Sequence, residues 1–210
     1  MGLIKRKRDK KRLKIGLFNV KKEPLNERKV EEENYFYPDF IFKVLLIGHN
    51  DSGKITHLES YGNAWFESNT KLTIGISFEI KEIKIENLNI KLQIWDLATE
   101  DHWRDLVPYY SRGALGAILM FETSNSETLD KLSYWVQTVR DNTPNIPMIL
   151  MGNYDDLDHP RQVLKEEGLE FVRSKELNGY FECNVLTGEN LENAFKSLTR
   201  MIIEKYENRD

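Results

Sequence analysis

Cysteine and histidine are scarce in this chain of 210 residues. The single cysteine, Cys183, excludes a disulfide within the chain and fits a reducing compartment. The four histidines are scattered and lack the spacing that zinc ligands require. The sequence therefore favours neither a disulfide-stabilised secreted protein nor a zinc protein.

Long apolar runs are missing as well. The longest, residues 114–121, has the length of a strand and falls short of the ~18 residues that span a bilayer. No apolar core segment follows the basic N-terminus, so we expect no secretory signal. The last residues contain no cysteine, so we expect no prenylation. These features predict a cytoplasmic protein whose contact with a cytoplasmic membrane face is at most peripheral.

Positive charge is concentrated near the N-terminus. Residues 1–34 carry 12 Lys+Arg and 6 Asp+Glu, whereas the remainder carries 18 and 28. This asymmetry predicts a basic N-terminal extension, residues 1–34, followed by one domain, residues 35–210. The extension is either a solvated tail or a contact with anionic membrane through residues 5–14. The acidic body shows no basic face, so we expect no nucleic-acid partner.

Apolar strands alternate with helical patterns from Phe40 onward. This order predicts an α/β fold of the P-loop NTPase type, a three-layer sandwich around a mostly parallel six-stranded sheet with one antiparallel edge strand. The expected strands are 40–47, 74–85, 90–96, 114–121, 147–151 and 180–183, and the expected helices are 56–66, 124–140, 160–174 and 189–206. A less regular region is expected between residue 97 and Arg112.

A phosphate-binding loop is predicted between Gly48 and Thr56. The segment follows a buried strand, precedes a helix, and fits the pattern G-x-x-x-x-G-K-[ST] except at its last position. Its main-chain N–H groups and the helix N-terminus attract phosphate, and Lys54 would reach the outer phosphates. Ile55 stands where a hydroxyl should hold Mg²⁺. On a helix Thr56 points about 100° away, so it is a poor substitute.

Three further loops should meet this one, because ligands of such sheets bind at the carboxyl ends of the strands. Asp96 follows the third strand, residues 153–156 follow the fifth, and residues 183–186 follow the sixth.

The segment from about Phe40 to Tyr206 resembles small GTPases of the Ras superfamily, and within them the Rab branch. Lys91–Asp96 matches the Rab pattern residue for residue, and Tyr110–Ala114 differs from it at one position. Residues 73–78 are similar to the switch I segment of that family, and Thr187–Asn190 is also Rab-like.

The resemblance implies a site for GTP or GDP. Phe66 would pack edge-on against guanine, Asp156 would accept two N–H groups from it, and Asn153 would tie the loops together. The backbone N–H of Val185 or Leu186 would reach the guanine oxygen. Helix-end packing for Phe66 and a capping role for Asp156 are the structural alternatives. The implied nucleotide-binding residues are Asn50, Asp51, Ser52, Gly53, Lys54, Ile55, Thr56, Phe66, Thr73, Asn153, Asp156, Val185 and Leu186.

The resemblance also implies a metal and a catalytic position. Thr73 would sense the γ-phosphate and Mg²⁺, and Asp96 would support Mg²⁺ through water, unless it only caps its strand. Glu100 occupies the position of the catalytic glutamine that orients the attacking water. With Ile55 unable to supply oxygen, we expect Mg²⁺ binding to be weakened.

The positions that depart from the family pattern are mainly those expected to contact the nucleotide or to take part in hydrolysis. Thr99 replaces a glycine whose amide approaches the γ-phosphate, and the charge of Glu100 would be repelled by the nucleotide. Tyr154 and Leu186 replace residues expected around guanine. We therefore expect slow or absent hydrolysis of GTP.

Two hypotheses follow. The first is a Rab-like molecular switch in membrane traffic or signalling, whose segments 67–78 and 96–112 bind effectors and regulators. The second is a pseudo-GTPase that serves as a protein-interaction module with weak or no nucleotide binding. A P-loop kinase or ATPase is disfavoured, because Asp156 and the Rab-like strand point to guanine.

Overall fold

The computed structural model describes residues 37–48, 76–97, 101–154 and 160–207. They form a six-stranded sheet with the strand order β2-β3-β1-β4-β5-β6. Strand β2 pairs antiparallel with β3, and the other neighbours pair parallel. The predicted α/β fold, with its single antiparallel edge strand, is therefore confirmed.

The elements follow one another in the expected alternating order. The strands are β1 (Phe40–Gly48), β2 (Ile76–Ile85), β3 (Leu88–Leu97), β4 (Gly116–Glu122), β5 (Met148–Asn153) and β6 (Gly179–Cys183). The helices are a 3-10 helix (Asp101–Leu106), α1 (Val107–Ser111), α2 (Ser126–Asn142), α3 (Lys165–Ser174) and α4 (Leu191–Glu207).

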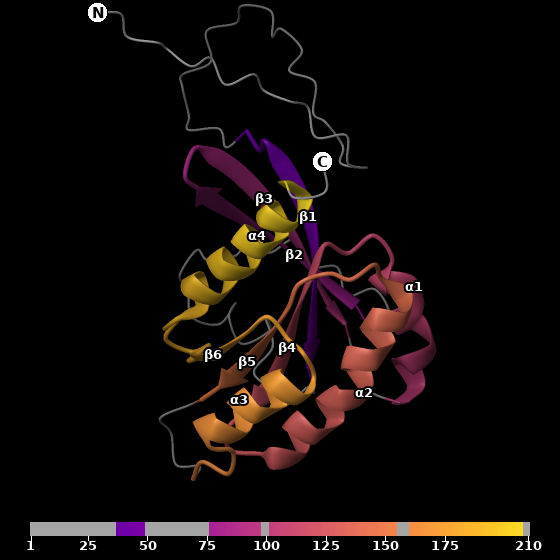
Figure 1. Ribbon diagram of the computed structural model, residues 1–210, viewed down its shortest axis with the longest axis vertical. Coiled ribbons are helices and arrows are strands. Elements are labelled where there is room, and N and C mark those ends of the chain that lie inside the picture. Colours follow the sequence, from indigo (N-terminus) through magenta and orange to yellow (C-terminus); the bar gives the residue numbers. More distant parts are fainter. Residues whose placement is uncertain (1–36, 49–75, 98–100, 155–159, 208–210) are drawn as a thin grey trace, which may run out of the picture.

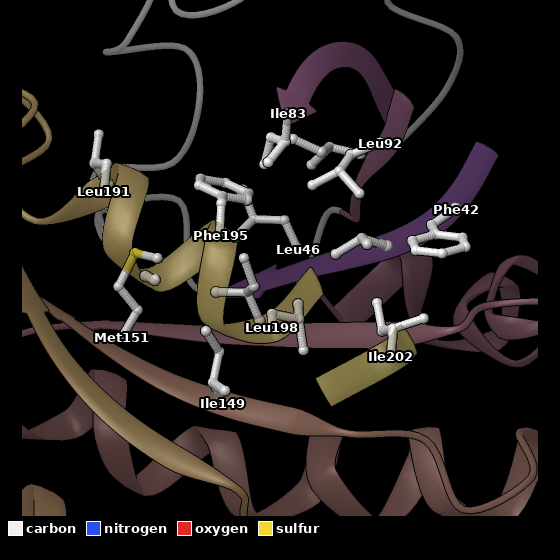
Figure 2. Close-up of a cluster of buried hydrophobic side chains, with 14 of the residues drawn as sticks. Phe42, Leu46, Ile83, Leu92, Ile149, Met151, Leu191, Phe195, Leu198 and Ile202 are labelled. Atoms are coloured by element: carbon white, nitrogen blue, oxygen red, sulfur yellow. The ribbon is translucent and has the colours of Figure 1, made fainter. Parts of the chain in front are cut away.

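Helices cover both faces of the sheet, so the domain has three layers (Figure 1). Helix α4 lies on one face, where Phe195, Leu198 and Ile202 pack against side chains from β1, β2 and β3 (Figure 2). Helices α1 and α2 lie on the other face with Leu129, Leu132 and Trp135 among the buried residues. Strands β4 and β5 are buried along their whole length because both of their faces are covered.

Three expectations about the helices are wrong. Helix α3 begins at Lys165 rather than Pro160, because Leu164 is extended and its N–H bonds to the side chain of Glu167; the N–H groups of Gln162 and Val163 bond to the carbonyl of Thr123. Helix α2 begins at Ser126 rather than residue 124, because Asn125 is extended and caps it, its side chain accepting from the N–H of Glu127. The region expected to be irregular before Arg112 contains the 3-10 helix and α1.

Within the described part of the chain, none of the helices combines the length and the apolar character needed to cross a membrane.

Candidate functional site

The carboxyl ends of the parallel strands meet at one edge of the sheet. Gly48, at the end of β1, pairs in register with Met120 of β4, and Leu97 of β3 pairs with Ile47. On the other side of β4, Glu122 pairs with Asn153 and Asn153 pairs with Cys183. The loops predicted to meet therefore leave the sheet from the same edge.

Asn153 joins three strand ends through its side-chain amide. Its Nδ2 donates to Oε1 of Glu122 at 2.6 Å, and its Oδ1 accepts from the N–H of Val185 at 3.1 Å. Asn153 is 4% exposed, so both bonds lie in the protein interior. The tie between loops that the family resemblance implies for Asn153 is present in the structure, and Glu122 is a partner that the sequence did not suggest.

The segment after β6 is held by a second asparagine. Oδ1 of Asn184 accepts from the N–H groups of Leu186 and Thr187, each at 3.0 Å. Both N–H groups expected to reach a guanine oxygen, those of Val185 and Leu186, are therefore bonded within the protein. To bind guanine through either of them, the N–H would have to be shared with or released from its present acceptor.

A third polar group lies where α3 approaches β6. The guanidinium of Arg161 donates to both carboxylate oxygens of Glu182, at 2.7 and 3.2 Å, and the Tyr180 hydroxyl donates to Oε1 at 2.9 Å. Burial alone would raise the pKa of Glu182, but these hydrogen bonds outweigh it and hold that pKa below its usual value. Burial is also the main cause of the raised pKa of Tyr180. This group fixes the chain immediately after residues 155–159.

Asp96 is the one residue of the predicted metal site that the structure describes. It is the penultimate residue of β3, is 9% exposed, and pairs in register with Leu46 of β1 and Ser77 of β2. A carboxylate in this position suits Mg²⁺, which prefers oxygen ligands. Among the described residues no three His, Cys, Asp or Glu side chains are grouped closely enough to hold a metal by themselves. Mg²⁺ would therefore depend on residues beyond those described, and on phosphate oxygens.

An aromatic surface, formed by Phe78, Trp95 and Tyr110, lies beside this edge. The rings of Phe78 and Trp95 meet edge to face with centroids 5.9 Å apart, and those of Trp95 and Tyr110 lie 6.2 Å apart. All three side chains are only partly buried. Phe78 belongs to the first predicted partner segment and Tyr110 to the second, so Trp95 bridges the two. The sequence motifs that contain Phe78, Trp95 and Tyr110 could be recognised from the sequence, but the contacts among these three rings could not.

The other predicted site residues lie outside the described part of the chain. They are Asn50, Asp51, Ser52, Gly53, Lys54, Ile55, Thr56, Phe66, Thr73, Glu100 and Asp156.

Known proteins resemble this chain over most of its length. The family model described as "Ras family" matches residues 43–204. Ras-related protein Rab-4A of Danio rerio is 39% identical over 170 residues, which cover 80% of this chain and 79% of that protein. Ras-related protein Rab-4B of Homo sapiens is 38% identical over 168 residues, covering 80% of this chain and 78% of that protein.

Proposed function

Because the chain belongs to the Ras family, in which it is Rab-like, we propose that it binds GTP or GDP at the carboxyl edge of the sheet and acts as a molecular switch. The observation that carries this proposal is the buried amide of Asn153, which joins the ends of β4, β5 and β6. Such a tie would keep the guanine-binding loops in one arrangement as nucleotide enters and leaves.

The proposed site assigns each loop one part of the nucleotide. Residues 50–56 hold the phosphates with main-chain N–H groups and Lys54. Asp156 accepts two N–H groups of guanine, which adenine cannot offer in the same geometry. Phe66 packs edge-on against the base, and Val185 and Leu186 line it with main-chain atoms.

We propose that hydrolysis of GTP to GDP and phosphate is slow or absent. When bound, Mg²⁺ supplies charge neutralisation at the phosphates, and Thr73 and Asp96 would hold it. Ile55 supplies no oxygen ligand, which weakens the metal site. Glu100 adds negative charge where the attacking water is oriented. At a separation of ~4 Å and an effective dielectric constant of ~20, the repulsion between the Glu100 carboxylate and one phosphate charge would be about 4 kcal/mol.

Partner proteins would bind the segments 67–78 and 96–112. The aromatic surface supports this assignment, because Phe78 and Tyr110 bring the two segments together around Trp95. Aromatic side chains dominate the energetics of protein interfaces. If either segment changed its conformation when GDP replaced GTP, the aromatic surface that both segments share would therefore change as well.

The second candidate is a pseudo-GTPase that serves as an interaction module. The bonded state of the Val185 and Leu186 N–H groups favours it, because the donors expected for the guanine oxygen already have acceptors. Ile55, Thr99, Glu100 and Tyr154 point the same way.

We further propose that the domain, residues 35–210, reaches the cytoplasmic face of an anionic membrane through residues 5–14, in membrane traffic or signalling. The eight Lys and Arg residues in that stretch support this. Each basic residue near an anionic surface contributes up to about 1 kcal/mol.

Nucleotide analysis of the purified protein tests the switch against the interaction module. Denatured protein is examined by chromatography for released nucleotide, and labelled GDP is titrated with and without Mg²⁺. The switch predicts bound GDP or GTP and a large loss of GDP affinity in Asp156→Asn. Absence of bound nucleotide, together with no thermal shift at millimolar GDP or GTP, would leave only the interaction module.

A further inference from the structure

Glu122 is a buried carboxylate at the end of β4, and it is 8% exposed. Burying a charged group is costly unless hydrogen bonds compensate it. Its Oε1 accepts from Nδ2 of Asn153 at 2.6 Å, and a hydrogen bond to an ionised acceptor is stronger than one between neutral groups. Glu122 and Asn153 also pair in register in the sheet. Glu122 is therefore a direct structural partner of the residue that joins the loops.

The partners of Asn153 determine the orientation of its amide. An asparagine side chain has one donor end and one acceptor end. The carboxylate of Glu122 can only accept, and the main-chain N–H of Val185 can only donate. If the amide turned by 180°, its NH₂ group would face the Val185 N–H and its oxygen would face a carboxylate. Only the observed orientation satisfies both neighbours. Because the amide is planar, the direction of its second Nδ2–H is fixed as well.

The main chain at Glu122 is itself held in place. The N–H of Glu122 donates to the hydroxyl of Thr128 at 2.9 Å, and that hydroxyl donates to the carbonyl of Asn125 at 2.6 Å. Thr128 is buried in the first turn of α2. Next in the chain, the N–H of Thr123 bonds to the carbonyl of Asn153 at 2.9 Å. The Glu122 carboxylate is thus presented from a rigid support rather than from a mobile loop.

We infer that Glu122 is a positioning residue for guanine-nucleotide binding, acting through the amide of Asn153, in the switch proposed above, on which this inference rests. Its carboxylate holds Nδ2, so that Oδ1 keeps the Val185 segment against the end of β5. Loss of this acceptor allows the amide to rotate, so that the Val185 segment loses the position in which its main chain lines the proposed guanine site. The consequence is weaker nucleotide binding, although no residue assigned a contact with the nucleotide is itself replaced.

The test compares GDP affinities of the full chain and four variants. Glu122→Ala removes the acceptor, Glu122→Gln keeps a neutral acceptor of the same shape, and Asn153→Ala removes the amide. Glu122→Ala/Asn153→Ala combines the two losses. Glu127→Ala is the control, because this carboxylate is exposed on α2 and its ion-pair partner is Lys131. Dissociation constants are measured with labelled GDP, and the melting temperature of each nucleotide-free chain is recorded beside them.

We expect Glu122→Ala to weaken GDP binding about tenfold, the cost of losing a hydrogen bond to a charged group. Glu122→Gln should stay within about threefold of the wild type, since only the charge assistance is lost. The double variant should bind GDP as Asn153→Ala does, because the carboxylate acts only through the amide. Glu127→Ala should match the wild type.

Three results would overturn the inference: unchanged GDP affinity in Glu122→Ala, an equal loss in Glu122→Gln, or additive losses in the double variant. If Glu122→Ala does not fold, the side-chain amide protons of Asn153 are observed by ¹⁵N NMR in the wild type and in Glu122→Gln. A downfield, slowly exchanging proton that moves upfield in Glu122→Gln supports the inference, and a freely exchanging one overturns it. A wild-type chain that binds no GDP would instead disprove the proposed function, which the same titration shows separately.

Discussion

The amine of Lys43 lies over the ring of Trp95, with Nζ 3.9 Å from the ring centroid, and it donates to the carbonyl oxygen of Arg112 at 3.0 Å. One side chain of β1 thus holds both the central ring of the aromatic surface and the residue that follows α1. Burial lowers the pKa of Lys43, because partial removal from water disfavours the charged form of its amine.

Replacing Lys43 by methionine should destabilise the protein by about 1 kcal/mol, because a cation–π contact and a hydrogen bond are lost while the aliphatic stem remains. Urea unfolding at pH 7 measures the difference. Lys84→Met, at an exposed position of β2, is the matched control and should change stability by less than about 0.5 kcal/mol. Equal effects of the two substitutions would mean that the contact with Trp95 contributes nothing.

The Arg161–Glu182 pair should make stability depend on pH in the acid range. The pKa of Glu182 is lowered in the folded chain, so its contribution is present above the unfolded pKa and is lost as pH falls through the folded pKa. At pH 7 Glu182→Gln should cost about 0.5–1 kcal/mol, a modest value because both side chains are partly solvated.

This difference should disappear in strongly acidic solution, where Glu182 of the wild type is protonated as well. Unfolding by urea at a series of pH values from 7 downward follows it. Glu170→Gln, which alters an exposed pair with Arg173, serves as the control. A wild-type advantage that persisted unchanged into acid would rule out the ion pair as its source.

Restoring a hydroxyl at residue 55 should strengthen the response of nucleotide binding to Mg²⁺. Ile55→Thr offers the missing oxygen, and Ile55→Val has nearly the same shape without it. With millimolar Mg²⁺ we expect Ile55→Thr to bind GDP about tenfold more tightly than Ile55→Val, and without Mg²⁺ we expect no difference. Titration of labelled GDP in both conditions decides the point. An identical Mg²⁺ response in the two variants would refute the role assigned to this position.

Removing residues 1–34 should reduce binding to anionic vesicles more than tenfold and leave the unfolding of the domain unchanged, because eight basic residues lie between positions 5 and 14. Co-sedimentation with vesicles of phosphatidylcholine and phosphatidylserine measures the loss. Vesicles of phosphatidylcholine alone provide the control and should bind neither chain. Undiminished binding of the shortened chain to anionic vesicles would assign the extension another purpose.

The sequence by itself determined the fold and the family. The apolar run of 114–121 had to become a strand covered on both faces, because its side chains leave no polar face for water. In the second half of β2, at the edge of the sheet, apolar and charged residues alternate, and Ile83 and Ile85 are buried while Glu82 and Lys84 are exposed. The motifs at 91–96 and 110–114 carried the resemblance that the family match bears out.

Tertiary structure decided what depends on groups far apart in the chain. Proline is favoured at the start of a helix, so the sequence suggests that one begins at Pro160. In the folded chain the carbonyl of Thr123, which follows β4, instead accepts the N–H groups of Gln162 and Val163. Helix α3 begins only at Lys165. The partners Glu122 and Asn153 are 31 residues apart. No local preference specifies such a pair, because only the packing of parallel strands brings their ends side by side and makes an unsatisfied buried carboxylate too costly to leave.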